Sequence, residues 1–116
     1  MGGLDGIYAL SFRGAASFGM GVIALRDGVI AGADVGGVIY DGTYNETAQD
    51  VTLDIEMTVP PGVSLVQGTA PRPTSYNVPF HAIIPKHAIE TNEPVLVDLP
   101  PGPMNVIIRR LRSLAH

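Results

Sequence analysis

The chain has 116 residues, 46% of them hydrophobic and 16% charged, with a net charge of −4 and no cysteine. A single domain of this length can bury a core without disulfides, and the lack of cysteine excludes them and argues against structural zinc. The composition is too apolar for disorder, yet no apolar run reaches the ~18 residues of a membrane-spanning helix. The first residues also lack the basic start of a signal peptide. We expect one domain, residues 1–116, in the cytoplasm and away from membranes.

Charge is unevenly distributed along the chain. Residues 1–56 hold eight acids and two bases (−6), whereas residues 57–116 hold three acids and five bases (+2). An acidic chain without a basic patch before its last strand predicts no direct nucleic-acid binding, because phosphate contacts supply most of that affinity. The asymmetry is either chance over a folded surface, or a sign of complementary surfaces between subunits or towards a basic partner.

The first third of the chain predicts three strands, at residues 4–13, 18–25 and 29–33. Asp27-Gly28 separates the second strand from the third. Such a pair favours the positive φ values of a type I′ turn, so these two strands should form a hairpin.

The middle of the chain contains the clearest strand. Residues 51–59 alternate without a fault, so that apolar and polar side chains fall on opposite faces, as in a strand with one solvated face. Before it, residues 37–44 predict a strand interrupted at Asp41-Gly42, and the polar stretch Asn45–Asp50 predicts a loop.

The remainder predicts a short return at residues 63–66, an irregular stretch at 68–77, and strands at 78–84, 94–99 and 104–111. Pro79 favours an edge position or a bulge, and residues 85–93 are the only place for a short helix. About eight strands joined by short turns, without helical periodicity or repeats, predict an all-β, antiparallel, eight-stranded barrel with at most one short helix.

An eight-stranded barrel fills its interior with side chains or holds one small ligand. The alternation places a set of apolar side chains inside, and the glycine-rich stretch adds three polar or aromatic candidates. We therefore consider a carrier of a small apolar ligand, with these candidate ligand-binding residues: Tyr8, Leu10, Phe12, Asp34, Tyr40, Tyr44, Leu53, Ile55 and Met57.

No arrangement in the sequence predicts catalysis. The three histidines lie at no ligand spacing, and phosphate-binding loops and a GxSxG elbow are absent. Asp54 and Glu56 are neighbours on one strand face, where a solvated surface is the usual explanation, and aspartates beside glycine usually hydrogen-bond their own turn. We expect no catalytic residue, no metal site and no cofactor. A cluster of arginines at 109, 110 and 112 either solubilises the last strand or contacts an acidic partner or ligand carboxylate.

Two stretches resemble the GrlR family, negative regulators of type III secretion. These are GIYALSFRG near the start and FGMGVIALRDGVIAGADVGGVIYDGTY after it, and the end of the chain adds Arg109–Leu111. The family pattern of DGIYSVSF, FGxGV and a glycine–aspartate–tyrosine stretch maps onto residues 5–12 and 18–22 and then onto Gly32, Asp34, Gly36, Tyr40, Gly42 and Tyr44.

The resemblance implies a lipocalin-like barrel that forms a homodimer and regulates by binding a protein partner, such as a transcriptional activator. In the type member an acidic surface loop holds that activator. The equivalent stretch here, Asn45–Asp50, carries only Glu46 and Asp50, which become the candidate partner-binding residues. A non-enzymatic regulatory binding protein is therefore our leading hypothesis, and the ligand carrier is the alternative.

Overall fold

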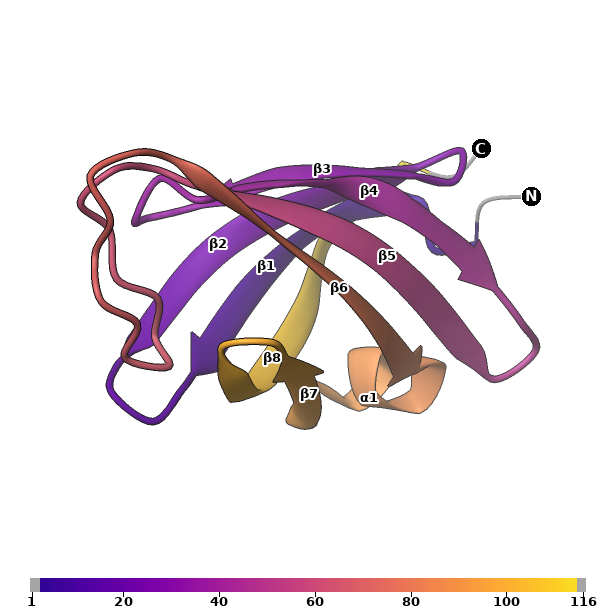
Figure 1. Ribbon diagram of the computed structural model, residues 1–116. Helices are drawn as coiled ribbons and strands as arrows, with labels where there is room; N and C mark the ends of the chain where they lie inside the picture. The colour runs from indigo at the N-terminus through magenta and orange to yellow at the C-terminus, as the bar shows by residue number, and fades with distance from the viewer. Residues whose placement is uncertain (1–2, 115–116) are drawn as a thin grey trace.

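The structure is a computed structural model that describes residues 3–114. It contains eight strands and one short helix (Figure 1). In chain order these are β1 (Gly6–Arg13), β2 (Phe18–Arg26), β3 (Val29–Asp34), β4 (Ile39–Glu46), β5 (Asp50–Val59), β6 (Tyr76–Pro85), α1 (Lys86–Thr91), β7 (Val95–Leu99) and β8 (Gly102–Ser113).

The eight strands form one antiparallel sheet that curls into a nearly closed barrel, which confirms the predicted fold class. The strand order is β6-β5-β4-β3-β2-β1-β8-β7, so the first strand pairs with the last. Strands β6 and β7 lie at the two ends of this order, and no ladder joins them among residues 3–114. The barrel therefore has a seam between β6 and β7.

The hairpin between β2 and β3 forms as the sequence predicts. Asp27 and Gly28 both have positive φ, at 52° and 82°, the backbone of a type I′ turn. Strand β5 also confirms its prediction, because its inward residues are all buried while Asp54 and Glu56 point outward. The buried members are Val51, Leu53, Ile55, Met57 and Val59.

Strand β4 differs from its prediction, because Asp41-Gly42 does not interrupt it. Gly42 pairs with Ile30 on one side and Ile55 on the other. A Cβ atom there would overlap the backbone carbonyl of Asp54, so glycine lets β4 and β5 approach closely. The glycine signals a close strand contact and not a break.

The predicted loop Asn45–Asp50 is also shorter than expected. Its ends belong to β4 and β5, which leaves residues 47–49 to make the turn. The Asp50 amide donates to Thr47 Oγ1 at 3.0 Å, and the Thr47 amide donates to the Asp50 carbonyl at 2.9 Å. These bonds close a short turn, so the polar residues Asn45, Glu46 and Asp50 belong to the strands.

The predicted return strand at residues 63–66 does not form, and residues 60–75 make one irregular loop. The Val66 carbonyl accepts hydrogen bonds from the amides of Ala16 and Ser17, each at 3.0 Å. Leu65 is buried against the core. The loop is thereby fixed across one end of the barrel, at the left of Figure 1.

The short helix α1 lies at the other end of the barrel, within the predicted segment 85–93 (Figure 1). It ends at Asn92, whose φ of 57° is left-handed, and it buries Ala88 and Ile89. Strand β7 pairs with β8 only as far as Val106. Beyond that point α1 packs against β8 and covers the side that β7 leaves unpaired.

Replacing Gly42 with alanine should destabilise the barrel, because the new methyl group forces β4 away from β5. We expect the free energy of unfolding to fall by ~1–3 kcal/mol in urea denaturation. Thr43→Ala, an exposed change on the same strand, is the control and should cost less than ~1 kcal/mol. Equal losses in the two variants would contradict the close-approach role of Gly42.

Candidate functional site

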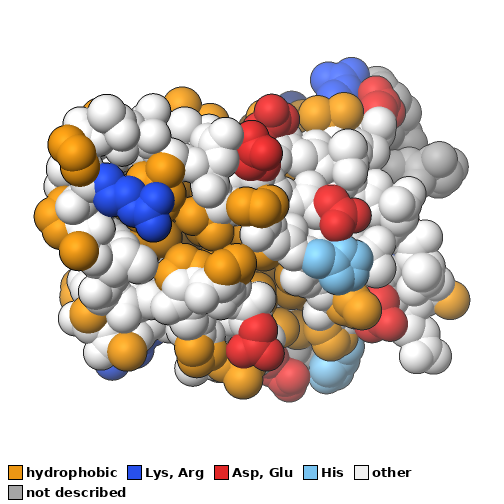
Figure 2. Space-filling model, in the orientation of Figure 1, with side chains coloured by type: hydrophobic (Ala, Val, Ile, Leu, Met, Phe, Trp, Pro, Cys, Tyr) orange, Lys and Arg blue, Asp and Glu red, His pale blue; other side chains and the backbone are white. Residues whose placement is uncertain are grey.

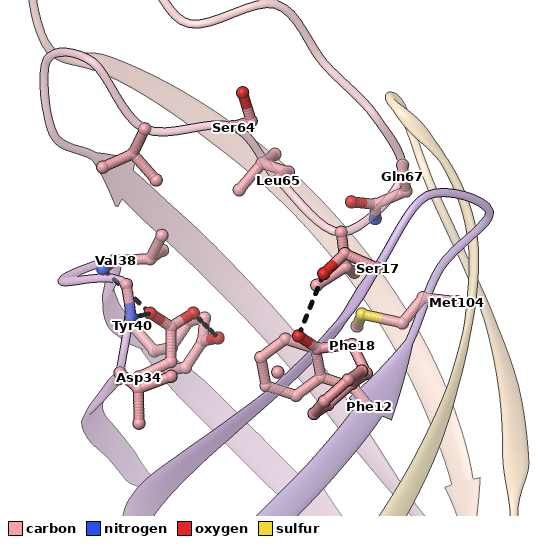
Figure 3. Close-up of a pocket in the computed structure, with 15 residues that line it drawn as sticks. Phe12, Ser17, Phe18, Asp34, Val38, Tyr40, Ser64, Leu65, Gln67 and Met104 are labelled. Carbon is pink, nitrogen blue, oxygen red and sulfur yellow. Dashed lines mark hydrogen bonds between the residues drawn. The ribbon is translucent and has the colours of Figure 1, made fainter.

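One end of the barrel is held by a hydrogen-bonded pair, Asp34 and Tyr40. Asp34 Oδ1 accepts from the amides of Gly36 at 2.9 Å and Val38 at 3.1 Å, and Oδ2 accepts from the Tyr40 hydroxyl at 2.7 Å (Figure 3). Burial, together with the bond to Asp34, raises the pKa of Tyr40 far above its ordinary value. Asp34 thus holds its own turn, as sequence patterns predict for an aspartate beside glycine.

The opposite end is held by a second pair, Asp5 and Tyr44. The Tyr44 hydroxyl donates to Asp5 Oδ1, and the Asp27 amide lies 3.4 Å from Asp5 Oδ2. The Tyr44 hydrogen bond holds the pKa of Asp5 below its ordinary value. Burial, followed by the bond to Asp5, raises the pKa of Tyr44 to about 12. Asp5 therefore ties the chain start to β4 and to the β2–β3 hairpin.

Beside Asp5, Arg110 contacts the buried Tyr8. The Tyr8 hydroxyl donates to the Leu4 carbonyl at 2.6 Å and accepts from Arg110 Nε at 3.1 Å and Nη2 at 2.9 Å. Tyr8 and Arg110 are register partners, and Arg110 has the same parity as the buried Val106 and Ile108 of β8; the bulge comes after this pair and places Arg112 opposite Ile7. The alternation along β8 thus turns Arg110 towards the barrel end, and the bulge, which residue parity alone does not predict, separates Arg112 from it.

The interior is a small apolar cavity of about 60 Å³. Every strand except β3 contributes to its lining. Figure 2, which views the molecule from the side of β6, shows hydrophobic side chains within a hollow on this face. Of the predicted ligand-binding residues, five line the cavity: Leu10, Phe12, Tyr40, Leu53 and Ile55.

A second hollow, of about 140 Å³, lies under the 60–75 loop at the Asp34 end (Figure 3). It shares Phe12, Tyr40 and Met104 with the interior cavity, so the two are adjacent. Asp34 lines this mouth, but both of its oxygens already accept hydrogen bonds. The other predicted ligand-binding residues, Tyr8, Tyr44 and Met57, are buried in the core and line neither hollow.

The predicted partner-binding residues do not lie on a protruding loop. Glu46 is the last residue of β4, and its Oε1 lies 3.0 Å from Lys86 Nζ of α1, with both side chains mostly buried. Asp50 is the first residue of β5 and is half-buried. The loop placement was wrong because the strands extend further than the polar composition suggested.

The outer wall of β2 and its neighbours is unexpectedly apolar. Its large side chains are strongly exposed: Phe18 (70%), Met20 (55%), Val22 (46%), Val35 (82%) and Ile39 (54%). Sequence patterns alone did not identify this surface. The available signal was the alternation of residues 18–22, where the glycines take the inward positions and the large apolar residues the outward ones.

Within residues 3–114, His81 and His87 each lie beside an acidic side chain at the surface. His81 Nδ1 lies 2.7 Å from Asp54 Oδ1, and His87 Nε2 lies 3.6 Å from Glu93 Oε1. Within residues 3–114, no group of three or more histidine or acidic side chains is placed to hold a metal ion. In the same range, no helix has the length and hydrophobicity needed to cross a membrane.

Comparison with known proteins adds no relationship: no family model matches the chain, and no curated protein matches its sequence. The surfaces described above therefore provide the structural basis for a function.

Replacing Tyr44 with phenylalanine should destabilise the fold most near neutral pH. Because the folded-state pKa of Asp5 is below its ordinary 3.8, the carboxylate stabilises the fold above that pH. This contribution is lost as the pH falls through the folded-state pKa. Urea denaturation should therefore show a large difference between wild type and Tyr44→Phe at pH 7 that shrinks below pH 3.8.

Tyr76→Phe is the matched control, because the buried Tyr76 hydroxyl has no hydrogen-bond partner within residues 3–114. Its removal should leave the unfolding free energy unchanged or raise it. A Tyr44→Phe effect that did not vary with pH would contradict the assigned role of Asp5.

Proposed function

We propose that this protein is a non-enzymatic regulatory binding protein, as its resemblance to the GrlR family implies. It works as a homodimer that binds a protein partner, such as a transcriptional activator. The observation that supports a binding role best is the apolar outer wall centred on β2. Contiguous apolar surface of this kind on a folded domain is typical of protein–protein contacts.

The wall is apolar because the strand register brings apolar residues of β1 to β4 side by side on the outer face. In one row across the sheet, Arg109, Ala9, Val22, Ala33 and Ile39 are successive partners. On the side towards the 60–75 loop lie Met20 and Phe18 of β2 and Val35 after β3, and Val35 donates its amide to the Met20 carbonyl at 2.9 Å. The centre of this face is thus free of charge.

Opposite charges flank the apolar centre, and this arrangement favours a second copy of the chain as the occupant. In the neighbouring row Arg112 on β8 begins the series, Ile7, Ala24 and Ala31 follow, and Asp41 on β4 ends it. A two-fold axis parallel to β2 superposes the β8 side of one copy on the β4 side of the other. Arg112 of each copy then meets Asp41 of its mate.

Native mass spectrometry of the purified protein tests this proposal. Wild type should appear mainly at the mass of two chains, and the double variant Met20→Glu/Ile39→Glu at the mass of one, because carboxylates would face each other in the apolar centre. Ile83→Glu, an equally exposed apolar residue (57%) on β6, is the control and should remain dimeric. A monomeric wild type, or a double variant that stays dimeric, would contradict the dimer.

The regulatory partner is proposed to contact the acidic end of β4 and β5. Glu46 and Asp50 lie on either side of the tight turn at residues 47–49, at the end of the barrel that α1 covers. Their charge suits a basic surface, such as that of a DNA-binding activator. Because Glu46 is already paired with Lys86, Asp50 is the more available of the two carboxylates.

Capture from cells tests this contact. The variant Glu46→Ala/Asp50→Ala should lose most of the captured partner, whereas Glu93→Ala/Asp98→Ala, which removes the same charge elsewhere, should keep it. Thermal unfolding of both variants checks that the fold is retained. If the first variant captured the partner as well as wild type does, this end of the barrel would not be the contact.

The second candidate function is a carrier of a small apolar ligand. It is favoured by the almost wholly apolar lining of the interior cavity and by the seam beside it. The free volume of about 60 Å³ is far below the ~300–1,000 Å³ of drug-sized ligand sites, so the occupant must be small. The same native spectra test this function, because a carrier is expected to retain an added small-molecule mass, and the absence of such a mass would contradict it.

A further inference from the structure

A separate hollow lies outside the barrel interior, between α1, the second half of β8 and the start of the chain. Its volume is about 510 Å³, within the usual range of small-molecule sites. Leu4 and Ile89, both buried, provide its apolar side. The other lining residues are polar, charged or glycine: Gly3, Glu46, Lys86, Glu90, Asn92, Arg109 and Arg110.

The charges in this hollow do not cancel. Lys86 and Glu46 neutralise each other across 3.0 Å. Arg109 and Arg110 form no ion pair with any carboxylate of residues 3–114, and Glu90 is the one further acid among the lining residues. Two arginines against one glutamate leave a net charge of +1, which matches a monoanion better than a dianion.

Arg110 is held in place before any ligand arrives. Its Nε and Nη2 donate to the Tyr8 hydroxyl, and Nη2 also donates to the Gly3 carbonyl at 2.8 Å. The guanidinium carbon lies 5.5 Å from the centre of the Tyr8 ring. Tyr8 is fully buried and bonded to Leu4, so this support is rigid. A guanidinium fixed in this way loses little entropy on binding an oxyanion.

We propose that this hollow binds a small monocarboxylate, whose carboxylate is held by Arg109 and Arg110 and whose hydrocarbon part rests on Leu4 and Ile89. Arginine binds carboxylates with paired, charge-assisted hydrogen bonds, and the apolar side accommodates a short chain. The site shares no lining residue with the interior cavity, and it meets the dimer wall only at Arg109, which ends the row that runs through Ala9 and Val22.

Calorimetric titration with sodium octanoate tests the site, with octanol as the uncharged probe and inorganic phosphate as the dianionic probe. Wild type should bind octanoate at least tenfold more tightly than octanol or phosphate. Arg109→Gln and Arg110→Gln should each weaken octanoate binding by about tenfold or more, because each removes a charge-assisted contact. Arg13→Gln, which removes the same charge from the far end of β1, is the control and should bind as wild type does.

Arg110→Gln removes side-chain bonds to Tyr8 and Gly3 and can perturb the fold. Arg109→Gln keeps the test valid in that case, since no side-chain hydrogen bond of Arg109 is present within residues 3–114. Amide chemical shifts should change at Ile89 and Arg109 and not at Val97 inside the barrel. The proposal is overturned if wild type does not bind octanoate, if octanol binds equally well, or if Arg109→Gln binds unchanged. Shift changes confined to the interior would overturn it as well.

Discussion

The barrel is held together by the pairing of its first strand with its last. Residues 6–13 pair with residues 105–113 through one bulge, so two ends of the chain separated by about a hundred residues form one stretch of wall. Once this contact fixes the curvature, the period-2 alternation assigns every side chain to the inside or the outside. The cavity, the apolar wall and the position of Arg110 all follow from that assignment.

Two tyrosine–aspartate pairs stabilise the two ends of this barrel in similar ways. Asp34 bonds to Tyr40 at the end covered by the 60–75 loop, and Asp5 bonds to Tyr44 at the end covered by α1. Both tyrosines lie on β4 and both point inward. The glycine–aspartate–tyrosine pattern therefore stabilises the barrel ends, and the proposed contact surfaces lie elsewhere, on the outer wall and beside α1.

Local sequence patterns predicted those parts of the fold that depend on neighbouring residues. Strand β5 follows from the alternation of residues 51–59, and the β2–β3 hairpin follows from the positive φ that Asp27-Gly28 favours. Both predictions were correct. Gly42 was misread because its role is a contact with β5, which no local pattern shows. Residues 63–66 have strand composition, but the Val66 carbonyl bonds to the β1–β2 turn and not to a ladder.

The candidate site was predicted less well, for a related reason. The alternation identified inward residues such as Leu53 and Ile55 correctly, but not how little space they leave between them. Glu46 was expected on a loop, and its ion pair with Lys86 could not be predicted because it depends on where α1 packs. The hollow beside α1 combines residues from the chain start, the helix and β8, and only the closed barrel brings these together.

We propose that the protein acts through its outer wall, with β2 at the centre of the contact between two copies. Isotope-filtered NMR on a mixture of labelled and unlabelled chains measures this contact directly. We expect intermolecular NOEs between the methyl group of Met20 and those of Val22, Val35 or Ile39 in the other copy. Intermolecular NOEs that involve only Ile83 or Leu96, or none at all at millimolar concentration, would contradict it.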